Sequence, residues 1–425
     1  MAATYLNITD QVKLFNEFIS KGVINQIRSR SKIFSQVKKD WSKIDVSGLY
    51  AKQKLMLAGS QSTGAASTPD YPEAQQSKPG ETIVYIKRAQ MFSMGFDGFS
   101  LEAAARGGAE MPPLDFEKKG LFITMADDLS RQLMYDGSAR LAQCNGAGGG
   151  ATKIITVDHP HFAKATKFLK AERNIDIYTD ADPGVLEGEE KIDTIDSDTQ
   201  ITILANESWS NDSWICNKNV YVDDEAAGKG EMMGLLGIVS ALDPPRPNDS
   251  LGLQGLTVAA NPAWKAHVFD NPLGAGTLRD IEEDLFIQVL DEVEDFAEVD
   301  VILVSPGVYR SYFALLQSYK TTPNQKKLWG GFSGLVFIYN GREIPVVSDK
   351  YIPDGHAFFL SMNDLILHVM TPNMISWEQG VSGAGILKQV TGKHQYVAEG
   401  HMYMNLATGL RPGFGLLRDI KEPGQ

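Results

Sequence analysis

The sequence predicts an α+β protein organised around one long helix, and three observations predict it. Apolar residues recur at steps of three and four within 114–143, which is the spacing of one helix face. Two runs with strand-like alternation, 49–57 and 81–96, precede that stretch. Many short strand-like runs follow it. We therefore expect a helical rod between a hairpin and a β-rich region.

The predicted helix has an apolar face and clear end signals. Pro112 and Pro113 punctuate its start. Gly137, directly after Asp136, provides a stop, because glycine readily takes the left-handed conformation of a helix end. About twenty helical residues make a rod of roughly 30 Å. We expect its apolar face in the core and its polar face at contacts between subunits; the apolar face is led by Phe122, Met125, Leu129 and Leu133.

Composition places the chain among globular proteins with a large core. It has 425 residues, of which 43% are hydrophobic and 22% charged. No apolar run approaches the ~20 residues that span a bilayer, and the N-terminus lacks the features of a secretory signal. Cys144 and Cys216 are too few for a disulfide framework or a metal set, which suits a reducing compartment. A net charge of −13 argues against a dedicated nucleic-acid binder, since phosphate contacts need clustered Lys and Arg.

Residues 1–48 are predicted to form a basic, amphipathic arm. Between positions 11 and 43 the net charge is +6, which leaves −19 for the remainder of the chain. The basic residues are Lys13, Lys21, Arg28, Arg30, Lys32, Lys38, Lys39 and Lys43. Because the arm also carries apolar residues, we expect it to bind an acidic surface of another copy. A core helix packed on its own subunit, or weak contact with nucleic acid, are the alternatives.

Residues 49–97 are predicted to form a long β-hairpin. In its second run, apolar residues share one face, as strand periodicity requires: Val84, Ile86, Phe92, Met94 and Phe96. The intervening segment 59–80 is rich in Ser, Thr, Gly, Ala, Gln and Pro and cannot build a core. Since a two-stranded hairpin is marginal alone in water, we expect it to lie on another surface.

After the helix, a flexible connector at 145–153 and a β-rich, acidic subdomain at 152–224 are predicted. The connector is Gly-rich but lacks the Gly-Lys-Ser/Thr order of a phosphate-binding loop and follows a helix instead of a strand. The runs that read as strands are 153–157, 175–179, 198–204 and 213–217.

Two candidate metal sites in this subdomain fail on spacing or ligand number. Nine acidic residues lie within 176–198, but they miss the Asp-x-Asp-x-Asp-Gly pattern of a calcium loop, so a solvated acidic face is expected. His159 and His161, beside Asp158, supply too few ligands for zinc.

Two helices are predicted in the second half of the chain. Thr277, with Asp280 three residues on, approaches a capping box. The stripe that would follow is Leu278, Ile281, Leu285, Val289, Val293 and Phe296. Ser305 and Pro306 supply a cap and a first-turn proline for a second helix, which runs to about position 319.

The remaining elements are predicted strands. Asn340-Gly341 is a strong turn signal between two apolar runs and predicts a hairpin. The other strands are expected at 300–304, 357–360, 365–370 and 394–406.

No catalytic constellation is found. Carboxylates of the first of these helices are expected to turn into solvent, away from the apolar stripe: Glu283, Asp284, Asp291 and Glu294. Ser333 and Ser382 lie in Gly-x-Ser-Gly sequences, which lack the last spacing of the Gly-x-Ser-x-Gly elbow. We therefore predict no catalytic, cofactor-binding or metal-binding residues.

Several phrases, taken in order, carry a resemblance to a known family. After the basic arm and the Ser/Gly-tipped hairpin come FSLEAAARGG and then LSRQLMYDG at 129–137, where the family often has LNRQLYGDG at the end of its long helix. VDVILVSPGVYRSYFALL at 299–316 and YNGREIPVVSDKYIPDGHAFFL at 339–360 fit as well. The chain resembles tailed-bacteriophage major capsid proteins of the Hong Kong 97 type.

The resemblance implies a Hong Kong 97-like fold with six parts. They are an N-terminal arm (1–48), an E-loop hairpin (49–97), a peripheral domain with the spine helix (98–151), a β-rich insertion (152–224), an axial domain (225–336) and strands that return to the core (337–425). It also implies a structural protein, not an enzyme, without cofactors. Such a protein self-assembles as pentamers and hexamers into the icosahedral head of a tailed bacteriophage around double-stranded DNA.

The same resemblance bears on partners and location. It implies a virion component assembled in the host bacterial cytoplasm, with weak DNA contact, no membrane, and room for portal, scaffold or decoration proteins. Some members lose an N-terminal scaffolding segment, of which no sign is seen here, and some cross-link a hairpin lysine to an asparagine. Lys52, Lys54 and Lys78 lie in the hairpin, but the sequence identifies no partner asparagine. An encapsulin-like compartment shell and a hydrolase using the acidic β-rich region are the alternative functions.

Overall fold

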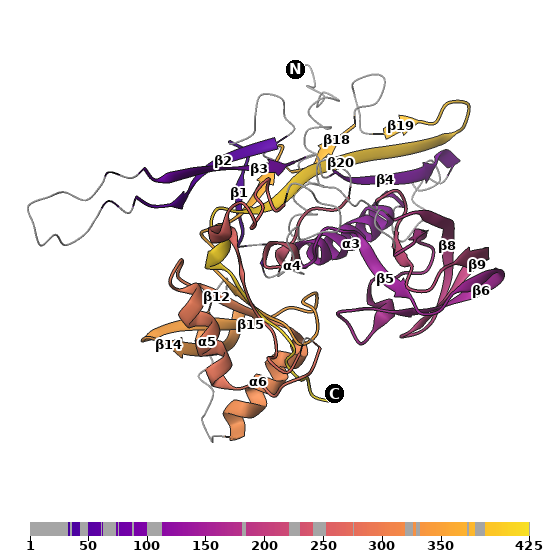
Figure 1. Ribbon diagram of the computed structural model, residues 1–425. Coiled ribbons are helices and arrows are strands. Elements are labelled where there is room, and N and C mark those ends of the chain that lie inside the picture. The colour runs from indigo at the N-terminus through magenta and orange to yellow at the C-terminus, as the bar shows by residue number, and fades with distance from the viewer. Residues whose placement is uncertain are drawn as a thin grey trace, which may run out of the picture.

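The computed structural model describes residues 33–34, 36–42, 50–60, 62, 74, 76–86, 89–99, 113–180, 184–220, 230–240, 252–274, 276–318, 326–328, 332–371, 374–378 and 387–424. Most of the predicted arm and of segment 59–80 therefore lies outside the described residues. The described part is sheet-rich with few helices, as Figure 1 shows. It contains a six-stranded sheet, a closed barrel, a seven-stranded sheet and a two-stranded ribbon.

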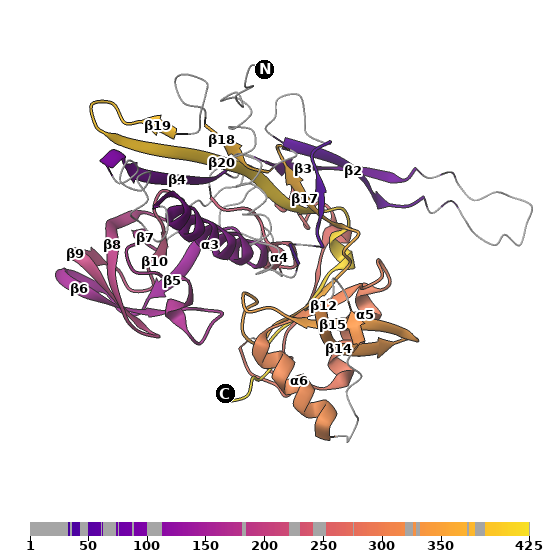
Figure 2. The same cartoon turned by 180° about the vertical axis from the view of Figure 1, so that it is seen from behind.

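The long helix α3 (Pro113–Met134) is confirmed, but it is shorter than the predicted stretch. Phe122, Met125, Leu129 and Leu133 are all buried, as their spacing predicts. The chain then turns through Gly137 at φ 74° and enters strand β5 (Arg140–Cys144), so the last part of 114–143 is strand, not rod. The expectation of a polar face at subunit contacts is wrong for Arg131, which belongs to that face by its spacing but is buried inside the subunit. Figures 1 and 2 show why: β4 lies on one side of α3 and the barrel on the other.

Six strands close the barrel in the order β10-β5-β6-β9-β8-β7. Besides β5 they are β6 (Gly148–Asp158), β7 (Asn174–Tyr178), β8 (Leu186–Ser197), β9 (Gln200–Trp209) and β10 (Trp214–Asn217). A short helix η1 (Ala165–Phe168) follows β6. The predicted strands are confirmed, whereas β8 was not predicted. Barrel closure removes the sheet edges that would otherwise invite pairing with other chains.

The Gly tract is not a flexible connector. Gly148 begins β6 and pairs with Trp209 of β9. Only a residue without a side chain lets the indole lie against the backbone at this position. A Cβ at Gly148 would lie 2.3 Å from the ring, whereas one at Gly149 would meet nothing within 4 Å. The ring is 5% exposed, and its Nε1 donates to the Gly146 carbonyl at 3.0 Å, so it is held in place.

Gly148→Ala is expected to destabilise the protein by about 1–3 kcal/mol, the usual cost of overpacking a site that cannot yield. Urea unfolding followed by tryptophan fluorescence would measure it. Gly149→Ala in the same strand is the matched control and is expected to change stability by less than about 0.5 kcal/mol. Equal stability of the two variants would contradict the assignment of Gly148 to the Trp209 contact.

The predicted hairpin 49–97 is two separate structures. Strands β2 (Tyr50–Ala58) and β3 (Lys78–Tyr85) form the antiparallel ribbon that projects from the body in Figures 1 and 2. The second half of the run is a different strand, β4 (Ala89–Asp97), which pairs with β20 (Gln395–Thr408). The expected apolar residues are buried as a set, but in two places: Val84 and Ile86, and Phe92 and Met94. The side chain of Phe96 lies outside the described residues.

Strand β20 also organises the sheet around it. One end pairs with β17 (Leu365–Val369), and the other with β4, β18 (Ser376–Trp377) and β19 (Leu387–Gln389). Strand β1 (Lys38–Asp40) adds to β17 in parallel. Ile33 and Phe34, just before β1, are fully buried in their own subunit. These two apolar residues of the predicted arm therefore pack on their own subunit, as in the alternative interpretation, but from a turn and not from a core helix.

The seven-stranded sheet has the order β11-β21-β16-β12-β15-β14-β13. Its strands are β11 (His267–Phe269), β12 (Val301–Val304), β13 (Lys326–Leu328), β14 (Phe332–Tyr339), β15 (Arg342–Ser348), β16 (Ala357–Leu360) and β21 (Gly415–Leu417). Asn340 and Gly341 join β14 to β15 with φ of 47° and 78°, as their turn signal predicts.

Two helices accompany this sheet. Helix α6 (Pro306–Ser318) begins as predicted, and the Ser305 hydroxyl accepts the Val308 N–H at 3.2 Å. Helix α5 (Glu283–Val293) begins later than predicted, with Glu282 at its N-cap, so Thr277 caps nothing. Leu278 and Phe296 accordingly fall outside the helix and are exposed. The remaining short helices are α4 (Leu235–Ile238), η3 (Pro262–Trp264) and η4 (Arg411–Gly413).

Candidate functional site

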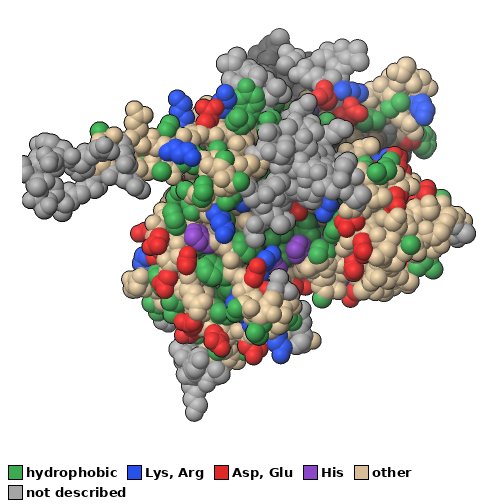
Figure 3. All heavy atoms as spheres, viewed as in Figure 1, with side chains coloured by type: hydrophobic (Ala, Val, Ile, Leu, Met, Phe, Trp, Pro, Cys, Tyr) green, Lys and Arg blue, Asp and Glu red, His purple; other side chains and the backbone are tan. Residues whose placement is uncertain are grey.

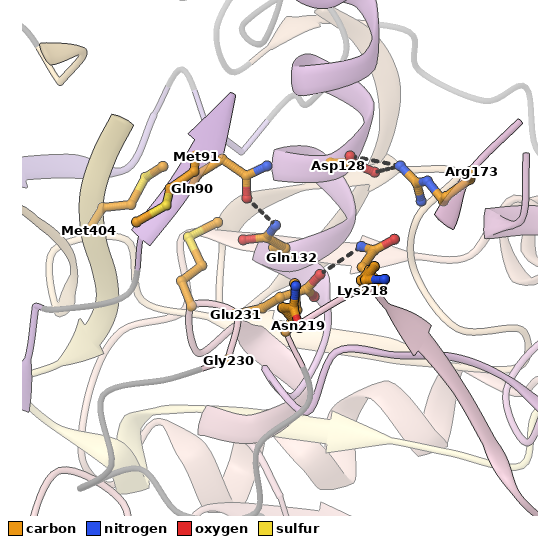
Figure 4. A pocket seen from close by; sticks show the side chains of 13 residues that line it. Gln90, Met91, Asp128, Gln132, Arg173, Lys218, Asn219, Gly230, Glu231 and Met404 are labelled. Atoms are coloured by element: carbon orange, nitrogen blue, oxygen red, sulfur yellow. Dashed lines mark hydrogen bonds and ion pairs between the residues drawn. The ribbon is translucent and has the colours of Figure 1, made fainter. Parts of the chain in front are cut away.

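The best-defined pocket lies where α3, β4, the barrel and the segment before α4 meet (Figure 4). Its volume is about 440 Å³. The side chains labelled in the figure come from these four elements and from β20, which supplies Met404. The others are Gln90, Met91, Asp128, Gln132, Arg173, Lys218, Asn219 and Glu231, with the backbone of Gly230.

A buried ion pair stands behind this pocket. Arg131 Nη2, from α3, donates to Glu231 Oε1, and the two side chains are only 2% and 3% exposed. Burial opposes a charge on Arg131, but the carboxylate of Glu231 outweighs it and raises the pKa of the guanidinium above its usual value. The pair therefore links α3 to the segment before α4 as two charges, and neither can lose its partner without leaving a buried charge.

The other polar groups of the pocket are also engaged with one another. Arg173 Nη2 contacts both carboxylate oxygens of Asp128 at 2.9 Å. Gln132 Nε2 donates to Gln90 Oε1 at 2.9 Å. The residues that line the pocket include no Ser, Cys or His, so they offer no hydroxyl or thiol nucleophile beside a histidine base. The arrangement fits a junction that ties helix, barrel and sheet together.

The two cysteines and the described serine of the Gly-x-Ser-Gly sequences lie in ordinary structural surroundings. Cys144 and Cys216 are both buried and free. Burial raises the pKa of Cys144 to about 12 and that of Cys216 also, which keeps both as inert thiols. Ser333 lies within β14, opposite Lys327 of the neighbouring strand, and not at a strand-to-helix turn. Ser382 lies outside the described residues.

Several acidic residues form hydrogen bonds and ion pairs that the side chains of a solvated face would lack. Asp176 is 1% exposed and accepts the Asn219 N–H at 2.7 Å. Asp291, on α5, accepts from the Tyr339 hydroxyl, and Glu294, at the C-cap of α5, pairs with Arg342. The expectation that these carboxylates face solvent is therefore wrong for Asp176, which is bound by the turn after β10, and for Glu294, which is bound by Arg342 of β15. No group of three or more His, Cys, Asp or Glu side chains in the described ranges could hold a metal ion.

His159 and His161 belong to a packed aromatic cluster between the barrel and the seven-stranded sheet. His159 Nε2 lies 2.9 Å from the Tyr135 hydroxyl, and its ring meets Phe162 at 5.0 Å. His161 meets His356 at 5.8 Å. Burial lowers the pKa of His159 to about 3 and of His356 to about 4, and neighbouring charges such as Lys167 and Arg418 add to this. These rings are neutral at pH 7 and serve the packing of the junction.

This cluster predicts acid sensitivity. The folded pKa of His159 lies below the unfolded value near 6.5, so its contribution is complete above pH 6.5 and is lost as pH falls toward 3. The loss is roughly 1.4 kcal/mol per pH unit in that window. Urea unfolding at pH 6.5 and 4.5 should therefore show a smaller loss of stability for His159→Phe than for the unmodified chain. An identical pH dependence in both would contradict a buried neutral His159.

The ribbon β2–β3 leaves apolar side chains partly uncovered. At its base, Ala51 and Val84 are buried against Ala407. Further out on the same face Leu55 and Leu57 are only half-buried, over Gly80, and Met56 on the opposite face is 67% exposed. Lys78 Nζ, at the start of β3, donates to Asn261 Oδ1 at 3.0 Å. Asn261 belongs to the same subunit, so this hydrogen bond holds the ribbon to its own body.

The acidic net charge of the sequence is visible on the surface of the described residues (Figure 3). In the face that Figure 3 shows, acidic side chains are spread over the β14–α5 lobe and the barrel. No helix within the described ranges is both long and apolar enough to cross a membrane.

Solved structures with this arrangement of elements decide the fold. A chain of the cyanophage A-1(L) capsid asymmetric unit superposes with a TM-score of 0.52, over 91% of this chain and 90% of that one, at 11% identity. The chain has the fold of a phage capsid protein. The predicted capsid fold is thereby confirmed. At this identity the similarity concerns the fold alone.

Other comparisons with the capsid fold are weaker. A chain of Mycobacterium phage Che8 covers 92% of each chain at 8% identity, with a TM-score of 0.43. The SrpI encapsulin of Synechococcus elongatus covers 37% of this chain and 54% of its own at 16% identity, with a TM-score of 0.29. Neither score is high enough to carry an argument. No family model matches the sequence, and no curated protein matches it.

Proposed function

We propose that this chain is the major capsid protein of a tailed bacteriophage, which self-assembles into an icosahedral head around double-stranded DNA. The observation that carries the proposal is the capsid fold over 91% of the chain. The projecting ribbon supports it, because Leu55, Met56 and Leu57 leave apolar area that a single subunit does not cover. Interfaces of obligate assemblies bury such area, commonly more than ~2,000 Å².

The six parts expected from the sequence take proposed roles in such a shell. The ribbon, within 49–97, is the E-loop that lies across a neighbouring subunit, and α3, within 98–151, is the spine of the peripheral domain. The axial domain is assigned to 225–336, with 337–425 returning to the core and 1–48 as the arm. The closed barrel supports the reading of 152–224 as an insertion, and its first strand extends that insertion back to Arg140. Subunits form pentamers and hexamers in the virion, after assembly in the host cytoplasm.

A structural role without catalysis accounts for the pocket in Figure 4, whose polar groups bind one another. The acidic body accounts for weak contact with DNA, because like charges repel the phosphates. Portal, scaffold or decoration proteins are the further partners that such a shell allows.

Negative-stain electron microscopy of the purified chain tests the proposal. We expect closed shells or isolated pentamers and hexamers at some salt concentration. Monomers in every salt condition would overturn it. Shells that co-purify with a bound enzyme and do not package DNA would favour a compartment shell over a phage head.

A further inference from the structure

A second, smaller cavity lies at the junction of α3, the barrel and the loop after β15. Its volume is about 130 Å³, well above the roughly 10–15 Å³ that one water needs, so it accommodates an ion of several atoms. Its lining residues are Asp127, Asp128, Arg131, Lys167, Phe168, Lys170, Lys350 and Tyr351.

Both carboxylates of this cavity already have partners. Asp127 accepts from the Tyr351 hydroxyl at 2.6 Å and lies 3.4 Å from Lys170 Nζ. Asp128 is bound by Arg173 through both oxygens. Four cations against two carboxylates leave the lining with a charge of +2. Counting Arg173 and Glu231, the partners of Asp128 and Arg131, leaves that balance unchanged.

Two of the cations retain unused hydrogen-bonding capacity. Arg131 uses Nη2 for Glu231, but its buried Nε and Nη1 have no partner. Lys167 forms no ion pair with any described residue, and its Nζ lies instead 3.7 Å from the centre of the Phe162 ring. Burial lowers the pKa of Lys167 to about 8, as does Lys350, against the opposing effect of Asp354, Glu422 and Asp349. Arg131 pairs with a carboxylate through one nitrogen only, and no described carboxylate forms an ion pair with Lys167, so a bound anion would give both residues a direct partner.

We propose that this cavity binds an oxyanion of the phosphate class, with Lys167, Lys350 and Arg131 as its ligands. A phosphate carries about −1.5 to −2 charge near pH 7 and strong acceptor oxygens, which match the +2 lining. The anion would connect three separate parts of the subunit: α3 through Arg131, η1 after the barrel strand β6 through Lys167, and the loop after β15 through Lys350. This site is independent of the capsid function.

Thermal unfolding of the full chain in inorganic phosphate, against sodium chloride of equal ionic strength, tests the site. The midpoint is expected to rise with phosphate concentration and then level off as the site fills. Lys167→Met should weaken the apparent affinity at least tenfold. Lys388→Met is the control, because Lys388 is also a partly buried lysine but lies on β19, which does not line the cavity. It should leave the phosphate response unchanged.

A second measurement does not depend on stability. Calorimetry near pH 8 in two buffers of different ionisation enthalpy should show proton uptake on phosphate binding, because the anion raises the pKa of Lys167, and Lys167→Met should abolish that uptake. If Lys167→Met does not fold, Lys350→Gln, at an exposed lysine, should weaken binding severalfold. Equal midpoints in phosphate and chloride, or equal affinities in Lys167→Met and Lys388→Met, would overturn the proposal. A short DNA duplex that displaces the phosphate would assign the site to backbone phosphates, and failure to displace it would assign the site to the free ion.

Discussion

Glu231→Gln is expected to reduce the free energy of unfolding by about 3–5 kcal/mol, the usual cost of removing one partner from a buried ion pair. The substitution leaves the guanidinium of Arg131 charged, 2% exposed and without its carboxylate. The other two nitrogens of this guanidinium already lack hydrogen-bond acceptors, so no nearby acceptor replaces the lost carboxylate. Urea unfolding at pH 7 would measure the loss. The loss is expected to be large because the pair is buried between α3 and the segment before α4.

The double variant Arg131→Met/Glu231→Gln separates this explanation from a packing effect. It removes the uncompensated charge and is expected to recover a large part of the stability lost in Glu231→Gln alone. Lys164→Met is the surface control: its partner is Asp198, both side chains are more than half exposed, and a change of at most about 1 kcal/mol is expected. A Glu231→Gln variant as stable as this control would show that the pair contributes little.

Leu55→Asp/Leu57→Asp is expected to abolish shell assembly while leaving the subunit folded. Both side chains are half-buried on the outer ribbon, beyond the point where Ala51 and Val84 meet the body. Each leucine is expected to contribute roughly 1.5–3 kcal/mol when a neighbour covers it, and a buried carboxylate would replace that gain with a desolvation cost. Because every subunit carries the ribbon, the loss recurs at each contact of the shell.

Electron microscopy and sedimentation would measure assembly, and circular dichroism would check the fold. Leu55→Met/Leu57→Met keeps volume and apolarity and is expected to assemble normally. Normal shells from the aspartate variant would contradict the E-loop assignment of the ribbon. Loss of the folded monomer, by contrast, would show that the ribbon stabilises its own subunit.

Elements with strong local signals could be predicted from the sequence. The spacing of Phe122, Met125, Leu129 and Leu133 gave the buried face of α3, and Asn340-Gly341 gave the β14–β15 turn. Ser305 with Pro306 marked the start of α6. In each case a few neighbouring residues decide the conformation, so no distant part of the chain is needed.

Elements that depend on distant partners could not be predicted. Strand β8 is acidic and only partly alternating, and its strand conformation depends on pairing with β7 and β9. Gly148 was predicted to belong to a linker, because the ring of Trp209, which requires a glycine there, lies 61 positions away in the chain. Likewise, alternation continued from β3 into β4 without any signal that β4 pairs with β20.

The contacts around α3 could not be predicted from the sequence for the same reason. Charged residues on a helix usually face solvent, so Arg131 was placed on an outer face. Its burial depends on Glu231, one hundred positions later, and on the barrel that covers it. Lys167 and Lys350 come together only when the barrel and the seven-stranded sheet take their places.

The pairing of β4 with β20 determines how this subunit would resist mechanical force. The ribbon continues along the chain into β4, so tension on the ribbon reaches β4 at Ala89. There nine residue pairs, from Tyr403 with Ala89 to Gln395 with Asp97, connect β4 to β20. Antiparallel hydrogen bonds lie perpendicular to the strands, so tension along β4 loads them in shear and they must break together instead of one by one. In the proposed shell, tension applied through the ribbon would pass along this line, and β20, the longest strand of the described residues, would bear it.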